Sequence, residues 1–284
     1  MLTVLFDGVA YGSLLFLISV GLSVTLGLLN FINLAHGAFA MFGGYLSVGL
    51  STRLGLPFLA TLPLVFCVIG ASGALLERLL YRRLYGSSHL DQVLFSIGLV
   101  FMSSAVASYF WGPGQQRVEL PQALRGQVAW LGLELGSYRL LLVALVIAIS
   151  LLLRGLVVHT RFGAQLRAAV DDARTAAGLG IPIGRIFNLT FALGSALAGL
   201  GGALGIEVLG LDPTFPLKYV VYFLLVVSVA GAGASLSTAL AAVVLGVCDI
   251  AGKYYLPELG AFSIYGLMVL LLLLFPAGLA RGRA

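Results

Sequence analysis

The stretch Asn33-Leu-Ala-His-Gly37 is a polar patch between two strongly apolar segments, Leu2 to Leu29 and Ala38 to Leu50. The hydrocarbon of a bilayer contains no water to pair with amides, imidazoles or freed backbone groups, so such a patch must face protein or an aqueous cavity. Transporters often place the path of their substrate at discontinuous helices of this kind. The stretch therefore predicts a break in a membrane helix, in a protein that moves a solute across a membrane.

The composition places the whole chain in a membrane. Of its 284 residues, 60% are hydrophobic and only 10% are charged, and the mean hydropathy is +1.08, whereas about a quarter of a soluble domain is charged. The apolar runs are continuous and do not alternate over about ten residues, which argues against an outer-membrane barrel. We expect an all-α, polytopic helical membrane protein, with one transmembrane domain over residues 1–284.

Apolar segments of roughly 20 residues are the candidate spans. Eight occur, at about 3–28, 37–52, 57–76, 92–111, 138–158, 186–206, 219–247 and 262–279. The seventh is too long for one span and is interrupted by Gly231-Ala-Gly-Ala-Ser235, so it forms one tilted helix, two half-spans or a re-entrant pair. We expect about eight membrane segments with one or two broken or re-entrant helices. The interruptions near residues 35 and 233 lie at similar places in the two halves, which indicates a weak inverted repeat.

The basic residues indicate the orientation, because cytoplasmic loops are enriched in Lys and Arg. The loops assigned to the cytoplasm contain Arg78, Arg82, Arg83, Arg154, Arg161, Arg167, Arg174 and Arg185, together with the tail residues Arg281 and Arg283. This assignment requires the 219–247 stretch to return to its starting side or to cross twice.

An external loop at about 112–137 should contain a short hairpin. The net charge of +5 comes without basic clusters interleaved with aromatics, so we expect no nucleic-acid partner.

Polar and glycine residues at the interruptions are the candidate substrate path. Asn30, Asn33 and His36 are spaced three apart and would follow one face of a helix. They either offer hydrogen bonds to a polar substrate or satisfy the backbone of a broken helix. The full set of predicted path residues is Asn30, Asn33, His36, Gly37, Gly231 and Gly233. No second His or Cys lies at ligand spacing, so neither a metal site nor a cofactor is expected.

The segment at about 160–185 predicts a short helix outside the membrane. Its alanines favour helix, Gly178 and Gly180 end it, and Pro182 prevents its continuation. An amphipathic helix of this kind fits a cleft on a soluble partner, although a solvated loop with ordinary cytoplasmic arginines would have the same composition. The predicted docking residues are Arg167, Asp171, Asp172, Arg174, Ala176, Ala177 and Gly178.

Two further patterns bear on packing and on energy supply. Gly194, Ala198 and Gly202, with Ser195, Gly199 and Ala203 beside them, form ridges of small residues that predict close helix packing.

The chain has no catalytic motif and no Gly-rich phosphate loop. It is therefore not expected to be an enzyme, and if ATP drives transport another chain must bind the nucleotide.

Taken together, these segments resemble the LivH-type permease subunits of the branched-chain amino-acid ABC importers over nearly the whole chain. The resemblance rests on Gly21-Leu-Ser-Val-Thr-Leu-Gly27, Ile32-Asn-Leu-Ala-His-Gly-Ala-Phe39, Glu77-Arg-Leu-Leu-Tyr-Arg82, Arg161-Phe-Gly163 and Ala176-Ala-Gly-Leu-Gly-Ile181. It implies a subunit of the bacterial inner membrane, surrounded by lipid and paired with a second permease that is LivM-like or identical. A periplasmic binding protein would deliver the substrate, ABC ATPase subunits would drive transport, and the 160–185 segment would be the coupling helix.

The sequence also departs from this family in its late membrane segment. The family usually has a Gly-Gly-x-Gly-Ser-type stretch followed by Pro-Gly-Ala, whereas this chain has Ala230-Gly-Ala-Gly-Ala-Ser-Leu-Ser-Thr238. An importer of urea, an amide or another small polar solute is therefore an alternative to one for branched-chain or other apolar amino acids. A stand-alone secondary carrier is a weaker alternative, because it needs intramembrane carboxylates and only Asp249, with Asp7 or Asp91 near span ends, could provide them.

Overall fold

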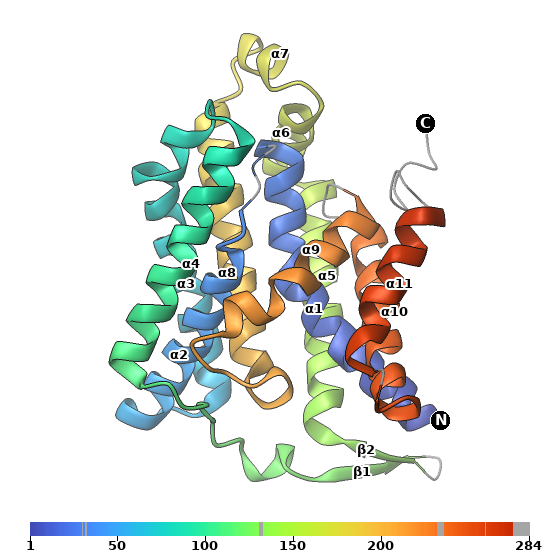
Figure 1. Ribbon diagram of the computed structural model, residues 1–284. Coiled ribbons are helices and arrows are strands. Elements are labelled where there is room, and N and C mark those ends of the chain that lie inside the picture. The colour runs from blue at the N-terminus through green and yellow to red at the C-terminus, as the bar shows by residue number, and fades with distance from the viewer. Residues whose placement is uncertain (30, 32, 131–132, 232–235, 259, 275–284) are drawn as a thin grey trace.

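A computed structural model describes residues 1–29, 31, 33–130, 133–231, 236–258 and 260–274. The chain is a bundle of helices with one small hairpin at one end (Figure 1). The membrane-length helices are α1 (Leu2–Leu29), α2 (His36–Leu54), α3 (Phe58–Leu79), α4 (His89–Trp111), α5 (Ser137–His159), α8 (Ile183–Leu209) and α10 (Leu236–Tyr255), and the shorter ones are α6 (Arg161–Asp171), α7 (Ala173–Gly178), α9 (Phe215–Ala230) and α11 (Gly260–Leu274). Two 3-10 helices, η1 (Tyr81–Leu84) and η2 (Gln122–Leu124), and the strands β1 (Gln127–Trp130) and β2 (Leu133–Gly136) complete the described elements.

The two ends of the bundle differ, and they define two sides of the molecule (Figure 1). The α7 side carries α6, α7 and η1, and the hairpin side carries β1, β2 and the N-terminus. The strands β1 and β2 pair antiparallel, with Val128 opposite Leu135. The hairpin expected within residues 112–137 is therefore confirmed.

Six described helices are long and apolar enough to cross a membrane: Leu2–Leu26, Phe58–Leu79, His89–Trp111, Ser137–His159, Ile183–Leu209 and Ser237–Tyr255. The expected segment 37–52 forms α2, and the last expected segment forms α11. The 219–247 stretch divides at Gly231 into α9, which starts earlier than expected, and α10. These two helices run in opposite directions, and α11 ends at Leu274 on the α7 side (Figure 1). The stretch thus returns toward the side on which it starts, which is one of the two arrangements that the arginine distribution required.

Backbone contacts between glycines hold the centre of the bundle together. A Cβ atom at Gly43 of α2 would lie 2.1 Å from the carbonyl oxygen of Gly199 in α8, and one at Gly202 would lie 1.9 Å from that of Ala40. On the other side of α8, a Cβ at Gly21 of α1 would lie 2.5 Å from the Cα of Gly194. The small-residue ridges predicted on α8 are confirmed, because they allow α1 and α2 to approach its backbone.

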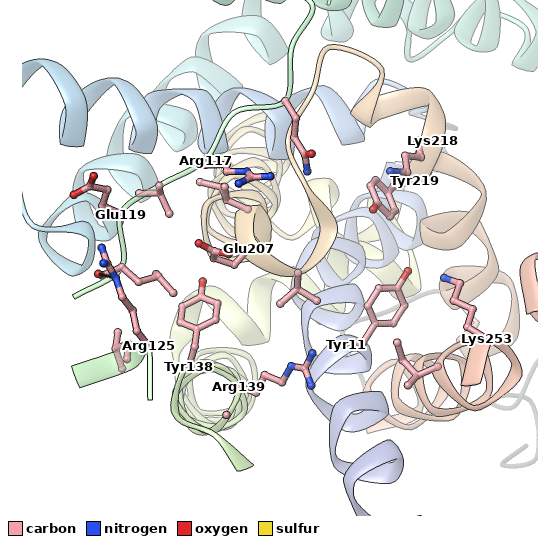
Figure 2. Close-up of a pocket in the computed structure, with 18 of the residues that line it drawn as sticks. Tyr11, Arg117, Glu119, Arg125, Tyr138, Arg139, Glu207, Lys218, Tyr219 and Lys253 are labelled. Carbon is pink, nitrogen blue, oxygen red and sulfur yellow. Dashed lines mark hydrogen bonds between the residues drawn. The ribbon is translucent and has the colours of Figure 1, made fainter. Parts of the chain in front are cut away.

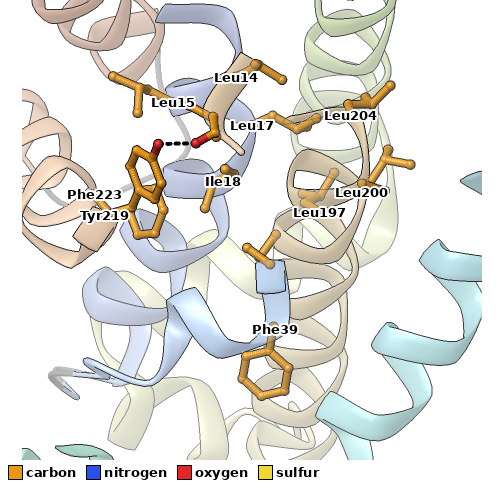
Figure 3. Close-up of a cluster of buried hydrophobic side chains, with 14 of the residues drawn as sticks. Leu14, Leu15, Leu17, Ile18, Phe39, Leu197, Leu200, Leu204, Tyr219 and Phe223 are labelled. Carbon is orange, nitrogen blue, oxygen red and sulfur yellow. Dashed lines mark hydrogen bonds between the residues drawn. The ribbon is translucent and has the colours of Figure 1, made fainter. Parts of the chain in front are cut away.

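The apolar core fills the space where α1, α2, α8 and α9 meet (Figure 3). Leu14, Leu17 and Ile18 of α1 are completely buried there, as is Leu204 of α8. Tyr219 of α9 belongs to this core, and its hydroxyl donates a hydrogen bond of 2.5 Å to the carbonyl oxygen of Leu209. The core therefore fixes the end of α8 and the start of α9 relative to α1.

Candidate functional site

The first interruption lies inside the bundle, between α1 and α2. Phe31, Asn33 and Ala35 are all buried, and the chain turns at residues 34–35 before α2 begins at His36. The Asn33 side-chain oxygen accepts hydrogen bonds from the backbone N–H of Ala35 and from the hydroxyl of Tyr81, each 3.1 Å long. The Asn33 side chain thus stabilises the start of α2, where backbone groups have no partner within the helix.

His36 and Gly37 pack against α1 and α9. The Nε2 atom of His36 lies 2.9 Å from the carbonyl oxygen of Ile18, to which it donates in the matching tautomer. A Cβ atom at Gly37 would lie 3.1 Å from the Cα of Pro216, so α2 and α9 meet closely at this residue. Both residues are buried. Asn33 and His36 therefore satisfy the broken helix, and a role of Asn33, His36 and Gly37 along the substrate path remains a prediction.

A second interruption, between α8 and α9, is built like the first. The Asp212 side-chain oxygen accepts from the backbone N–H of Thr214 at 2.8 Å, as Asn33 does from Ala35 two residues further on. The Leu211 side chain is completely buried, and α9 begins at Phe215 directly after the turn. Residues 31–35 and 210–214 thus share one kind of turn, whereas the inverted repeat predicted between the interruptions near residues 35 and 233 involves residues 232–235, which lie outside the described residues.

The Gly-rich stretch after α9 approaches α1. Gly231 ends α9 with a φ of +81°, a backbone conformation that favours glycine. Its carbonyl oxygen accepts a hydrogen bond of 3.2 Å from the Ser23 hydroxyl. Gly231 therefore ends α9 at the start of the predicted interruption, and its role along the substrate path remains a prediction. The predicted path residues Asn30 and Gly233 lie outside the described residues.

A large cavity opens on the hairpin side of the bundle, between the ends of α1, α5, α8, α9 and α10 (Figure 2). Its volume is about 1520 Å³, larger than the roughly 300–1,000 Å³ of ordinary small-ligand pockets. Tyr11, Lys218, Tyr219 and Lys253 lie along one wall, and Glu119, Arg125 and Tyr138 lie across from them (Figure 2). We refer to this space as the outer cavity.

No local sequence pattern indicated the outer cavity, because its walls come from distant parts of the chain. Tyr11 of α1 and Lys253 of α10 are 242 positions apart, yet the Lys253 Nζ atom lies 5.6 Å from the centre of the Tyr11 ring. Arg139 of α5 pairs with Asp7 of α1 beside the cavity. The available signal was a set of basic residues scattered among the apolar segments on the side opposite the predicted cytoplasmic loops. The positive-inside rule does not explain basic residues on that side.

A buried polar cluster on the α7 side is a further feature that local sequence patterns did not indicate. Glu77 of α3 is 1% exposed, and its two oxygens accept from the Tyr85 hydroxyl at 2.8 Å and from the Asn188 amide at 2.6 Å. Burial, together with the hydrogen bond to Glu77, raises the pKa of the Tyr85 phenol, so that the phenol stays protonated and donates. The cluster joins α3 and η1 to the start of α8.

Two short helices project from the α7 side, at the place where the sequence predicted one (Figure 1). The Thr160 hydroxyl caps α6 by accepting from the N–H of Gly163 at 3.1 Å, and the Asp172 carboxylate caps α7 by accepting from the N–H of Thr175 at 3.0 Å. The hydrogen bonds from Thr175 hold the pKa of Asp172 below its ordinary value. We refer to α6 and α7 together as the projecting helices.

Most of the predicted docking residues are exposed on the projecting helices. The exposed ones are Arg167, Asp171, Asp172, Arg174, Ala177 and Gly178. Arg167 also donates to the carbonyl oxygen of Val157 at the end of α5. Ala176 is 3% exposed, so it faces the protein and positions α7. Leu179, which follows α7 directly, is an apolar side chain that is 79% exposed, and it was not among the predicted docking residues.

Comparison with known proteins identifies the family. The model of the branched-chain amino acid transport system permease component matches residues 4–275. This chain belongs to that permease family. Its members are subunits of transport systems, so the family assignment confirms a multi-pass membrane permease that is not an enzyme.

Several curated proteins of the permease family are similar to this chain over nearly its full length. It is 28% identical to the high-affinity branched-chain amino acid transport system permease protein LivH of Salmonella typhimurium, covering 97% of this chain and 94% of that protein. It is 27% identical, with the same coverage, to the permease protein BraD of Pseudomonas aeruginosa. It is 25% identical to a probable LivH of Methanocaldococcus jannaschii, over 97% of this chain and 91% of that protein. No solved structure matches.

Proposed function

We propose that this chain is the membrane-spanning permease subunit that forms the translocation path of an ABC importer for branched-chain or other apolar amino acids. The family match over residues 4–275 carries the proposal, and similarity to LivH and BraD supports the substrate class. The partners are ABC ATPase subunits, a second permease subunit and a periplasmic substrate-binding protein. The complex lies in the bacterial inner membrane, with the hairpin side facing the periplasm.

The orientation and the arrangement of the two sides support this proposal. Eight of the basic residues that the structure describes lie on the α7 side: Arg78, Arg82, Arg83, Arg154, Arg161, Arg167, Arg174 and Arg185. The α7 side is therefore assigned to the cytoplasm. The outer cavity then faces the periplasm and can receive a solute from a binding protein.

The projecting helices are the coupling element in this proposal. They are connected to α5 and α8, which run through the bundle, so a displacement of α6 and α7 by an ATPase would be transmitted to both. The exposed Leu179 beside charged side chains provides an apolar anchor with a polar surround, a common arrangement for a helix in a groove.

The test of this function is purification of the tagged chain from its native membrane with mass spectrometry of the accompanying proteins. A near-stoichiometric ATPase and a second permease are expected, and the reconstituted complex should take up leucine only with ATP and the loaded binding protein. A homo-oligomer without ATPase would instead support a secondary carrier. ATP-dependent uptake of urea or an amide, without uptake of leucine, would support the alternative substrate class.

A further inference from the structure

The outer cavity concentrates positive charge on the side of the protein where the positive-inside rule predicts little of it. Six described Lys and Arg residues lie on the hairpin side: Arg53, Arg117, Arg125, Arg139, Lys218 and Lys253. Five of these six, all except Arg53, line the outer cavity, and only two acidic residues, Glu119 and Glu207, line it with them. Two of the five cations pair with acids behind the wall, Arg139 with Asp7 and Lys253 with Asp249. The cations therefore exceed these four acids by one, and the cavity offers several cationic donors to an anionic group.

Both lysines of the chain, Lys218 and Lys253, belong to this lining, while every other basic residue is an arginine. Lysine presents a compact ammonium with three donors on a flexible stem. Such a group can hold one acceptor while it binds a second one that arrives and leaves.

Lys253 is positioned by a buried acid in the same helix. Its Nζ atom lies 2.5 Å from the Oδ2 atom of Asp249, one turn earlier in α10. The Asp249 side chain is fully buried, whereas that of Lys253 is 46% exposed. An ionised acid inside a membrane helix is costly, and such residues usually mark a functional site. The pair places one ammonium at the cavity wall with its position fixed from behind.

Aromatic rings surround this ammonium. The Lys253 Nζ atom lies 5.6 Å from the centre of the Tyr11 ring and 6.0 Å from that of Tyr222. Tyrosine rings provide apolar surface for an aliphatic side chain, and their faces also attract a cation such as an ammonium. A carboxylate, an ammonium and an aliphatic group are the three parts of an apolar α-amino acid.

We infer that Lys253 binds the carboxylate of an apolar α-amino acid in the outer cavity, that Asp249 is its positioning residue, and that Tyr11 and Tyr222 contact the rest of the ligand. The inference rests on the proposed function and deepens it, because it assigns the first site that the substrate meets in the permease. Lys218, whose Nζ atom lies 5.3 Å from the centre of the Tyr219 ring, belongs to the same wall.

Amine footprinting tests the site directly, because the chain contains only two lysine amines. The purified complex in lipid nanodiscs is treated briefly with an acylating reagent, and modification of each lysine is measured by mass spectrometry. L-leucine should lower the modification of Lys253. Isoamylamine, which has the same side chain and amine without the carboxylate, should not. Equal protection by both compounds, or protection by neither, overturns the inference.

Uptake by variants separates a binding role from a structural one. Lys253→Met alone leaves Asp249 buried without its partner and can misfold, so the informative variant is Asp249→Asn/Lys253→Met, which removes both charges. Loss of a hydrogen bond to a charged group predicts at least about tenfold slower leucine uptake. Lys253→Arg should retain part of the uptake, and Arg53→Gln, a cation of the same side outside the cavity, should retain nearly all of it. Wild-type uptake by the folded double variant overturns the inference.

These results also distinguish the inference from the proposed function. ATP-driven leucine uptake with no carboxylate-dependent protection of Lys253 would refute the binding site and leave the importer standing. Carboxylate-dependent protection of Lys253 in a chain that purifies without an ATPase would support the binding site and refute the importer.

Discussion

The close contact between α2 and α8 at Gly43 provides a quantitative test of the packing. In Gly43→Ala, the new Cβ of α2 would lie 2.1 Å from the Gly199 carbonyl oxygen and 2.4 Å from its Cα atom. Because non-bonded carbon contacts are favourable near about 3.5 Å, the two helices must separate by more than about 1 Å. Overpacking of a filled core costs about 1–3 kcal/mol.

The matched control for this variant is in the same helix. At Gly49 of α2 an added Cβ meets nothing within 4 Å, so Gly49→Ala brings the helix-forming advantage of alanine without a clash. That advantage, about 1 kcal/mol, is shared by both variants and cancels in their difference. Gly43→Ala should therefore be less stable than Gly49→Ala by about 1–3 kcal/mol.

Thermal unfolding in detergent, followed by far-ultraviolet circular dichroism, measures this difference. At about 2–4 °C of Tm per kcal/mol for a chain of this size, Gly43→Ala should melt roughly 2–12 °C below Gly49→Ala. Equal melting temperatures would refute the close approach of α2 and α8. A low melting temperature for Gly49→Ala would show that α2 faces another element there.

Three further results are expected from variants at the interruption and at the projecting helices. Asn33→Leu leaves two buried donors unpaired and should cost about 2–4 kcal/mol of stability, more than Tyr81→Phe, which removes one donor. If uptake falls further than the amount of folded protein, Asn33 also has a role in the substrate path. Equal losses would show that its role is only structural. An added side chain at Gly178 meets open space, so Gly178→Asp should leave the fold intact and abolish ATPase stimulation by the loaded binding protein, while Gly178→Ala should not; unchanged stimulation in Gly178→Asp would remove the coupling role. Hydrogen bonds from Thr175 lower the pKa of Asp172, so the cap of α7 is complete above the ordinary carboxyl pKa of about 4 and is lost as pH falls through the lowered pKa. Hydrogen exchange of the α7 backbone should therefore accelerate in acid. The same acid response in Asp172→Asn would exclude protonation of Asp172 as its cause.

The sequence predicted those parts of the fold that depend on local composition. Long apolar runs specify α1, α5 and α8, because a bilayer requires about 20 apolar residues for a crossing. The polar patch at Asn33 predicted the first interruption, since its side chains need partners that hydrocarbon does not provide. Alanines bounded by glycine and proline predicted one short helix in the projecting segment, but not the break at Asp172 that divides it into α6 and α7.

Features that depend on distant contacts could not be predicted in the same way. The second interruption comes before Phe215, because Asp212 forms the turn and Pro216 lies in the first turn of α9; the apolar pattern alone begins the segment at residue 219. The outer cavity unites Tyr11 with Lys253, and no pattern within a window of the sequence relates them. The burial of Asn33 and His36 against Tyr81 and Ile18 likewise required the folded chain.

The glycine contacts around α8 limit which parts of the protein can move. Backbones that touch directly have no long side chains between them to change rotamer, so we expect α1, α2 and α8 to move together as one rigid body. By contrast, only 11% of an 18-residue apolar stretch of α5 is buried, against 83% of the corresponding stretches of α1 and of α8. Both α5 and α8 continue into the projecting helices, so in the proposed importer a displacement of α6 and α7 would tilt the less buried α5 more than α8. Spin-label distances between α2 and α8 should stay constant through the ATP cycle while those between α5 and α1 change, and the reverse would contradict a rigid centre.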